Sequence, residues 1–312
     1  KGGDIKILCG GEPFPSDLAS TLSDMCAQVW NMYGPTETTV WSTCRQVSPG
    51  RPNVIGSPIG NTQCYVLNEQ LQQQPLGVEG ELYIGGQGVT HGYLNRPELT
   101  EAAFVNVSSL GNELLYKTGD SVRLIESGEL EYVQRIDNQV KVRGYRIELG
   151  EIESVIIKHE AVSECAVAVK EYTSVDKRIV AYVRFAGTQH LTMTDIRRYL
   201  RDYLPDYMIP QLLVELDAMP LTPNGKIDRK AFPAPDAGRP ELASEYLEPQ
   251  NEDEIRLAKI WSVVLRVDTI GVNDNFFELG GHSLKATRLV SLVSKELEVK
   301  LSLKEVFTQV TI

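Results

Sequence analysis

The feature that most constrains the fold is a stretch near residue 235 with the composition of a linker. Residues 232–240 read FPAPDAGRP, with three prolines and no hydrophobic periodicity. Proline has no amide hydrogen and a fixed φ angle, so such a stretch forms neither a helix interior nor a central strand. We therefore expect a linker over 233–248, with folded units on both sides of it.

The rest of the chain has the composition of a globular protein. Its 312 residues are 42% hydrophobic and 23% charged, with 31 Lys and Arg against 42 Asp and Glu, a formal net charge of −11. This length indicates two or more domains. The negative charge argues against a nucleic-acid partner.

The cysteines give no sign of a disulfide framework or a zinc site. Cys9, Cys26, Cys44, Cys64 and Cys165 are odd in number, scattered and without a CxxC pair, which favours a reducing cytoplasmic location. No apolar run approaches the roughly 18 residues of a membrane span, and no basic and apolar leader opens the chain. We therefore expect no membrane association.

The first fifty residues have the pattern of an α/β unit. Short apolar runs at 5–9 and 28–32 predict two strands, the first followed by a Gly-Gly turn at 10–12 and a helix. The second run leads into NMYGPTETT at 31–39. Open α/β sheets bind ligands at the carboxyl ends of their strands, so we expect both loops near a ligand site.

The stretch NMYGPTETT carries functional groups suited to a nucleotide. Gly34 and Pro35 form a turn, the threonine hydroxyls can donate to phosphate oxygens, Glu37 offers oxygen to a hard cation, and Tyr33 offers a face to a base. An ordinary surface turn has a similar composition. The stretch alone leaves both interpretations open.

Alternating runs after the first unit predict a small β-rich subdomain. The clearest are 63–67 and 80–84. GGQG at 85–88 is not followed by a helical pattern, so we interpret it as a loop between strands and assign it no chemistry. YKTGD at 116–120 closes a strand with Asp120, whose carboxylate can accept from two hydroxyls; an ordinary turn is the alternative.

Five motifs in order resemble the core motifs of nonribosomal peptide synthetase adenylation domains. They are NMYGPTETT (31–39), GELYIGGQG (80–88), YKTGD (116–120), RIDNQVKVRGYRIE (135–148) and PNGKIDRK (223–230). The resemblance implies a multidomain α/β and α+β protein that activates an amino acid with ATP as aminoacyl-AMP. It implies the C-terminal part of an adenylate-forming core, an α/β sheet plus a small β subdomain, over 1–136. An α+β lid over 137–232 would follow.

The resemblance also implies roles for single residues. For nucleotide and metal these are Tyr33 against adenine, Thr36 near the phosphates, Glu37 on Mg²⁺, Asp120 on the ribose, and Tyr132 and Arg135 along the nucleotide. Asp137 would be the hinge about which the lid rotates between the two half-reactions. Lys226 would bridge the substrate carboxylate and the phosphate. The loop 141–146 would face the incoming carrier arm.

The lid pattern supports this division from the residues themselves. Apolar residues at helical spacing over 152–156 predict a helix, and alternation over 161–169 and 178–185 predicts two strands. A second helix is predicted over 192–203. Pro223 and Gly225, outside these elements, shape the loop that presents Lys226.

After the linker, helical faces over 255–265 and 289–297 enclose FFELGGHSL at 276–284. This string resembles the modification site of peptidyl carrier proteins and places Ser283 at a helix start; a plain N-cap serine is the alternative. The resemblance implies a small helical-bundle carrier domain over 249–312, truncated at its C-terminus. It implies 4′-phosphopantetheine on Ser283, attached by a phosphopantetheinyl transferase.

Five residues match the positions that line the amino-acid pocket in the family: Ile7, Cys9, Met32, Val40 and Trp41. None is charged, and a charged substrate without a partner in a desolvated site is costly. Trp41 and Met32 would fill much of the pocket, so we expect a small amino acid, glycine first and alanine second. The alternative is that both belong to the core.

The chain resembles a fragment of one synthetase module. The family's phosphate loop and the aspartate that holds the substrate amine lie upstream of Lys1, and neighbouring condensation or other synthetase domains are expected partners. Two alternatives remain open. One is an acyl-CoA or aryl-acid ligase, which has no use for the Ser283 segment, and the other is a non-enzymatic lid-plus-carrier fragment.

Overall fold

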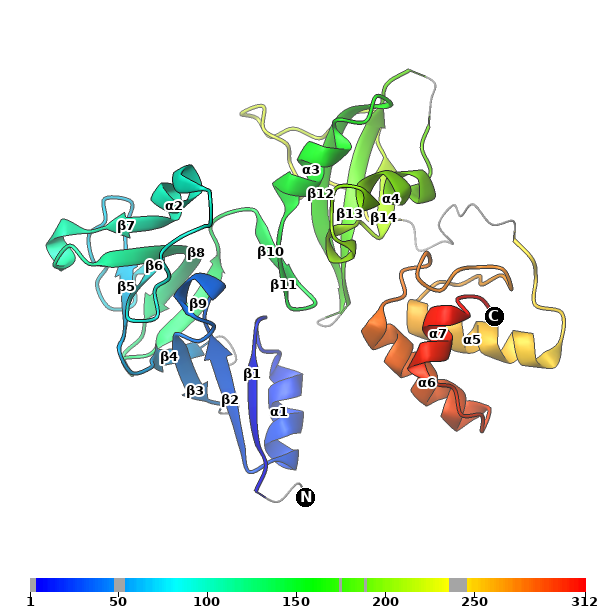
Figure 1. Ribbon diagram of the computed structural model, residues 1–312, viewed down its shortest axis with the longest axis horizontal. Helices are drawn as coiled ribbons and strands as arrows, with labels where there is room; N and C mark the ends of the chain where they lie inside the picture. The colour runs from blue at the N-terminus through cyan, green and yellow to red at the C-terminus, as the bar shows by residue number, and fades with distance from the viewer. Residues whose placement is uncertain (1–3, 48–53, 174–175, 188–189, 236–245) are drawn as a thin grey trace. The chain divides into compact units, whose positions relative to one another are not determined.

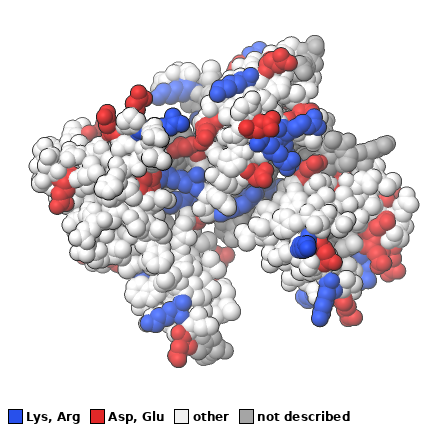
Figure 2. All heavy atoms as spheres, in the orientation of Figure 1, with Lys and Arg blue, Asp and Glu red and all other residues white. Residues whose placement is uncertain are grey.

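The computed structural model describes residues 4–47, 54–173, 176–187, 190–235 and 246–312. It divides into two compact units, Lys1–Ile147 and Glu148–Ile312 (Figure 1). Acidic and basic side chains are interspersed with uncharged ones on the face drawn in Figure 2. Over the described ranges, no helix is both long and apolar enough to cross a membrane.

One nine-stranded sheet dominates the first unit. Its strands follow the order β1-β2-β3-β4-β9-β8-β6-β5, and β7 pairs with β8 beside this path. The strands are β1 (Lys6–Gly10), β2 (Gln28–Tyr33), β3 (Thr43–Gln46), β4 (Val54–Pro58), β5 (Thr62–Leu67), β6 (Glu79–Gly86), β7 (Phe104–Asn106), β8 (Leu114–Leu124) and β9 (Leu130–Arg135). The predicted α/β part and β-rich part therefore share one continuous path of paired strands.

The predicted α/β unit forms one edge of this sheet. Helix α1 (Ser16–Met25) connects β1 to β2, and these two strands are parallel, whereas β2 and β3 are antiparallel. β1 and β2 approach each other closely at their carboxyl ends. A Cβ added to Gly10 would lie only 2.3 Å from the carbonyl oxygen of Met32. The loops after β1 and β2 consequently leave the sheet at the same edge.

A separate two-stranded hairpin completes the first unit. It consists of β10 (Gln139–Val142) and β11 (Tyr145–Glu148). The turn residues Arg143 and Gly144 have φ angles of 54° and 79°, the backbone that a tight two-residue hairpin connection requires. The other short elements of this unit are η1 (Thr36–Thr38), α2 (Pro97–Ala103) and η2 (Ser108–Leu110).

The lid at the start of the second unit is α+β, as predicted. Its sheet has the order β12-β13-β14, from β12 (Val162–Thr173), β13 (Asp176–Phe185) and β14 (Leu212–Glu215). Its helices are α3 (Leu149–Ile156), α4 (Met193–Arg201) and the short η3 (Asp206–Met208). The apolar side of α3 is buried, and Thr192 caps α4 by accepting from the backbone of Asp195.

The last residue of the predicted lid and the first residue of the predicted linker pack on the lid sheet. Phe232 is 4% exposed and stacks on Tyr182, with ring centroids 4.1 Å apart. The Tyr182 hydroxyl donates to the carbonyl oxygen of Pro233 at 2.9 Å. The middle of the predicted linker, 236–245, lies outside the described residues.

The last part of the second unit is a small helical bundle of α5 (Glu252–Leu265), α6 (Ser283–Glu296) and α7 (Leu303–Thr308) (Figure 1). Its core includes Trp261, Leu265, Phe276, Leu289 and Val293. Phe276 is fully buried and meets Trp261 edge to face at 5.1 Å. The segment between α5 and α6 thus supplies part of the core. Ile255, on the predicted face of the first helix, is instead 41% exposed.

We expect Phe276→Ala to destabilise this bundle by about 3–5 kcal/mol, because it empties the volume of a buried ring. Phe307→Ala is the matched control, since Phe307 is 50% exposed, and it should cost less than about 1 kcal/mol. Urea unfolding, monitored by amide hydrogen exchange in α5 and α6, measures the stability of both variants. Equal losses in the two variants would contradict the assignment of Phe276 to the core.

Candidate functional site

The loop after β2 folds back sharply on itself. A Cβ on Gly34 would lie 2.6 Å from the carbonyl oxygen of Val40 and 2.7 Å from the amide of Ser42, so this position requires glycine. Thr39 and Val40 have φ angles of 62° and 70°. Such backbone is rare for β-branched residues and persists only where surrounding contacts impose it.

Several hydrogen bonds impose this conformation. The hydroxyls of Thr38 and Ser42 lie 2.6 Å apart, and the Thr39 hydroxyl donates to the carbonyl oxygen of Gly88 at 2.7 Å. The amide of Thr90 donates to the carbonyl oxygen of Glu37 at 2.9 Å. The GGQG loop, to which we assigned no chemistry, therefore helps to position the loop that carries Glu37.

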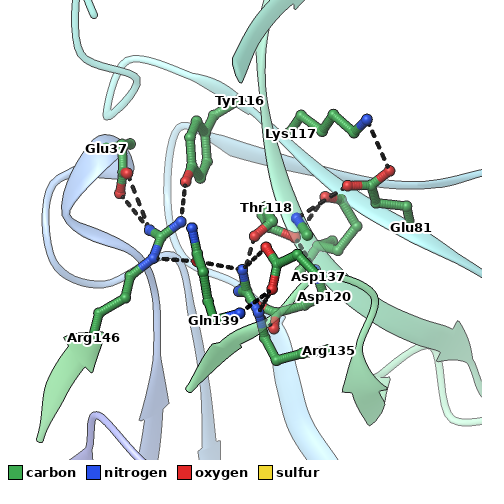
Figure 3. Close-up of polar contacts among 12 residues, drawn as sticks. Glu37, Glu81, Tyr116, Lys117, Thr118, Asp120, Arg135, Asp137, Gln139 and Arg146 are labelled. Carbon is green, nitrogen blue, oxygen red and sulfur yellow. Dashed lines mark hydrogen bonds and ion pairs between the residues drawn. The ribbon is translucent and has the colours of Figure 1, made fainter. Parts of the chain in front are cut away.

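Glu37 points into a cluster of polar side chains. Arg146, from β11, donates from Nη1 to both carboxylate oxygens at 3.0 Å each (Figure 3). The Tyr93 hydroxyl donates to Oε1 at 2.6 Å. Arg146 also donates from Nη2 to the Tyr116 hydroxyl at 3.0 Å and from Nε to Gln139 at 2.6 Å. The loop after β6, through Tyr93, and β11, through Arg146, thus both donate to the carboxylate of Glu37.

This surrounding keeps Glu37 ionised. Burial alone would raise the pKa of the carboxyl group, since the side chain is largely removed from water. The hydrogen bond from Tyr93 and the charge of Arg146 outweigh burial and hold the pKa of Glu37 below its ordinary value. The carboxylate therefore remains negatively charged at neutral pH and can act as an oxygen ligand to a cation.

A second carboxylate lies in the β8–β9 pair. Asp120 is 3% exposed and stands opposite Arg135 across the two strands. Its Oδ2 accepts from the Tyr33 hydroxyl at 2.5 Å, and its Oδ1 accepts from Nη1 of Arg135 at 3.0 Å. Each oxygen keeps a further lone pair, which is the capacity that ribose hydroxyls would need.

Arg135 joins this carboxylate to the predicted hinge. Its guanidinium pairs with the carboxylate of Asp137 and donates to the side chain of Gln139 at 2.5 Å. The same group donates to the carbonyl oxygen of Thr118 at 2.9 Å. Tyr132, predicted along the nucleotide, is partly buried, and burial together with the charge of Asp120 raises the pKa of its hydroxyl to about 12.

The donor chemistry of Glu37 fits a magnesium ion bound together with phosphates. Mg²⁺ is usually held by one or two carboxylates, with waters and substrate phosphates completing its octahedron. Across the residues that the structure describes, no group of three or more His, Cys, Asp or Glu forms a metal cage. A single carboxylate beside the exposed Thr36 matches the phosphate-assisted kind of site.

The five predicted pocket residues differ in exposure. Ile7 and Cys9 alternate along β1 and are both partly buried, and Met32 is 9% exposed. Val40 and Trp41 are 62% and 44% exposed. Trp41 is therefore not a core residue of this unit, whereas burial of Met32 agrees with either interpretation.

Lys226 lies at an exposed turn in the lid. The backbone amide of Thr222 donates to the carbonyl oxygen of Lys226 at 2.7 Å, and Gly225 has a φ angle of 74°. This closed turn holds the backbone in place and leaves the ammonium group at the surface, as the PNGK pattern predicts.

Ser283 is the first residue of α6 and is exposed. The N-cap position belongs to His282, whose Nδ1 accepts from the backbone amide of Lys285 at 3.5 Å. The alternative of an N-cap serine is therefore wrong, because the histidine before it takes that position. The serine hydroxyl is left outside the cap, and Leu284 beside it is 67% exposed.

Three residues of the Glu37 cluster had no predicted role: Tyr93, Tyr116 and Gln139. Arg146 was predicted only as part of the loop 141–146 that would face the carrier arm, and the structure places it in β11. Tyr116, Gln139 and Arg146 fall inside the motifs that resemble those of the family, and this was the only signal that they belong to the site. Arg146 lies 109 positions after Glu37 and Tyr93 lies 56 positions after it. No local pattern relates residues so far apart.

Family models match three consecutive parts of the chain. The AMP-binding enzyme model matches residues 2–94, the AMP-binding enzyme C-terminal domain matches 151–226, and the phosphopantetheine attachment site matches 256–312. The first range contains the Glu37 loop. The second ends at Lys226, and the third contains Ser283.

The chain is also similar to parts of known synthetases. It is 46% identical to gramicidin S synthase 2 of Brevibacillus brevis over 310 residues, which is 98% of this chain and 7% of that protein. It is 44% identical to a dimodular nonribosomal peptide synthase of Bacillus subtilis (strain 168) over 311 residues, which is 99% of this chain and 13% of that protein.

A solved structure agrees with both comparisons. Holo-PA1221, a nonribosomal peptide synthetase protein containing adenylation and carrier domains bound to a vinylsulfonamide inhibitor, matches with a TM-score of 0.74 and 29% identity. The match covers 95% of this chain and 50% of that one. The chain thus spans a small part of the curated synthetases and half of this solved protein. It belongs to the nonribosomal peptide synthetase family and contains part of an adenylation domain followed by a carrier domain.

Proposed function

We propose that this chain is the C-terminal part of a module that activates an amino acid with ATP and loads it on its own carrier domain. The observation that carries the proposal is the exposed Ser283 at the start of α6, on the same chain as the Glu37 and Asp120 sites. An acyl-CoA or aryl-acid ligase has no use for this serine. The module would work in a reducing cytoplasm beside condensation or other synthetase domains.

The first half-reaction would use the side chains of the first unit. Tyr33, Asp120, Tyr132 and Arg135 would bind adenine and ribose, and Thr36 would donate to the phosphates. Glu37 would hold Mg²⁺, which neutralises phosphate charge as pyrophosphate leaves. The lowered pKa of Glu37 keeps its carboxylate negatively charged, and this charge supports the role in binding Mg²⁺.

The second half-reaction would transfer the aminoacyl group to the carrier. The phosphopantetheine arm, once attached at Ser283, supplies the thiol that accepts the acyl group. Rotation about Asp137 would separate the two half-reactions. The contact between Asp137 and Arg135 supports a hinge that is linked to the nucleotide-binding residues.

The competing proposal is a lid-plus-carrier fragment without activity of its own. The two proposals differ in ATP–pyrophosphate exchange, measured on this chain and on the complete module. Exchange by the module but not by this chain would mean that the chain holds only part of the adenylation site. Absence of exchange in both would refute the proposed function.

We expect Ser283 to accept one phosphopantetheine group. Incubation with CoA and a broad-specificity phosphopantetheinyl transferase should add one such mass to the chain, and Ser283→Ala should add none. Ser291→Ala is the control, because Ser291 is an exposed serine of the same helix. Modification that persists in Ser283→Ala would show that the attachment site is elsewhere.

We expect Lys226→Ala in the complete module to lower kcat of adenylation by about a hundredfold or more, the effect of losing one preorganised charge contact. Thioester transfer from a preformed adenylate should change far less, which single-turnover kinetics can measure. Lys230→Ala, which removes another exposed lysine of the motif, should affect neither step. Equal losses in both steps would contradict this division of roles.

We expect the complete module to prefer glycine, then alanine, because no charged residue lies among the predicted pocket positions and Trp41 occupies space that a side chain would need. Trp41→Ala should shift pyrophosphate exchange toward larger amino acids. The exposed position of Trp41 allows this substitution without loss of core packing. A wild-type preference for leucine, phenylalanine or arginine would refute the pocket assignment.

A further inference from the structure

A bulge interrupts the pairing of β6 with β8 directly at Asp120. The register of the two strands shifts between Glu81 and Tyr83. Residues 118–120 of β8 consequently stand opposite the single residue Leu82 of β6. The extra residues of a bulge lack partners in the ladder, and bulges are common beside active sites. The backbone groups of this bulge therefore need hydrogen-bond partners from outside the ladder.

The side chain of Glu81 supplies one of these partners. Its Oε1 accepts a hydrogen bond from the backbone amide of Gly119 at 3.0 Å. Its Oε2 accepts from the Tyr83 hydroxyl at 3.3 Å and lies 3.7 Å from the ammonium of Lys117 (Figure 3). The side chain is only 15% exposed. The carboxylate of Glu81 is thus held at both oxygens, and one of them faces the bulge.

The bulge is tightly packed at Gly119. This residue has a φ angle of 74°, and a Cβ added to it would lie 2.5 Å from Oδ2 of Asp137 and 2.8 Å from Nη2 of Arg135. Its carbonyl oxygen accepts from the backbone amide of Ile136 at 2.8 Å. The position has no room for a side chain, so hydrogen bonds to its amide and carbonyl groups fix the backbone here.

Asp120 is the last residue of the bulge. Its backbone amide donates to the Thr118 hydroxyl at 3.0 Å, and that hydroxyl donates to the carbonyl oxygen of Leu82 at 2.8 Å. Asp120 is 3% exposed, and its two carboxylate oxygens accept from Tyr33 and from Arg135. A shift of the bulge backbone would therefore move a buried carboxylate that has little space to readjust.

We propose, on the basis of the proposed ribose-binding role of Asp120, that Glu81 is a positioning residue for this carboxylate. Glu81 acts through the amide of Gly119, which it holds in the conformation that directs Asp120 toward the ribose hydroxyls. Removal of Glu81 leaves a partly buried amide without an acceptor, and rearrangement of the bulge would recover part of that cost. Recognition of the ribose depends on Glu81, whereas recognition of the amino acid does not.

The first test measures amide hydrogen exchange of Gly119 in the 312-residue chain, prepared with isotope-labelled glycine and without nucleotide. Glu81→Ala should accelerate this exchange about tenfold or more, because the amide loses its acceptor. Glu81→Gln keeps an acceptor oxygen and should stay within about threefold of wild type. Glu79→Ala is the matched control, since Glu79 is an exposed carboxylate on the same face of β6, and it should leave the exchange unchanged.

The second test measures ATP–pyrophosphate exchange by the complete module with ATP and with dideoxy-ATP, which lacks both ribose hydroxyls. The wild-type module should have the higher kcat/KM for ATP, because a site built for hydroxyls leaves polar groups unpaired without them. Glu81→Ala should lower kcat/KM for ATP about tenfold or more and change that for dideoxy-ATP by less than about twofold. The KM of the amino acid should stay unchanged. Simple destabilisation of the fold would instead lower both kcat/KM values equally.

The two tests separate failure of this proposal from failure of the proposed function. Wild-type exchange of the Gly119 amide in Glu81→Ala, or an undiminished preference of this variant for ATP over dideoxy-ATP, would overturn the positioning role and leave the proposed function intact. A wild-type module that uses ATP and dideoxy-ATP equally well would refute the ribose role of Asp120 and the positioning role with it. Absence of pyrophosphate exchange by the wild-type module would refute the proposed function and this role together.

Discussion

Two buried carboxylates, Glu37 and Asp120, constrain the first unit more than any other feature. They are 9% and 3% exposed, and a buried charge is tolerated only when cations and hydrogen-bond donors surround it. Those donors come from β2, from the loop after β6, from β9 and from the hairpin. The sheet order that brings these strands together is therefore what makes a charged site at this position possible.

The backbone of the Glu37 loop follows from the same requirement. Left-handed φ angles at Thr39 and Val40, and the absence of a side chain at Gly34, fold the loop tightly enough to aim Glu37 toward Tyr93 and Arg146. Such backbone is unfavourable for β-branched residues. The hydrogen bond from Thr39 to Gly88 is one of the contacts that offset it.

The second unit presents its functional groups differently. Lys226 and Ser283 are exposed, and each lies at a closed backbone feature: Lys226 in the turn that begins at Thr222, and Ser283 directly after the His282 cap. The roles that we propose for them involve molecules outside the unit, so local rigidity matters more than burial. The first unit instead buries its charges and fixes them with partners from several strands.

Much of this was predictable from the sequence alone. Hydrophobic periodicity predicted the first two strands, the lid strands at 161–169 and 178–185, and the carrier helices, because each depends on residues close in the chain. Ordered motifs identified the family and proposed Glu37, Asp120, Lys226 and Ser283, since their residue types and spacing lie within single segments.

The tertiary structure alone decided which groups meet. It joined the two predicted β regions into one sheet and brought Tyr93 and Arg146 to Glu37. These outcomes depend on strand pairing and on the cost of burying charge without partners, which no window of sequence contains. The sequence determined which side chains stand within each motif, and folding determined which of them form hydrogen bonds and ion pairs with one another.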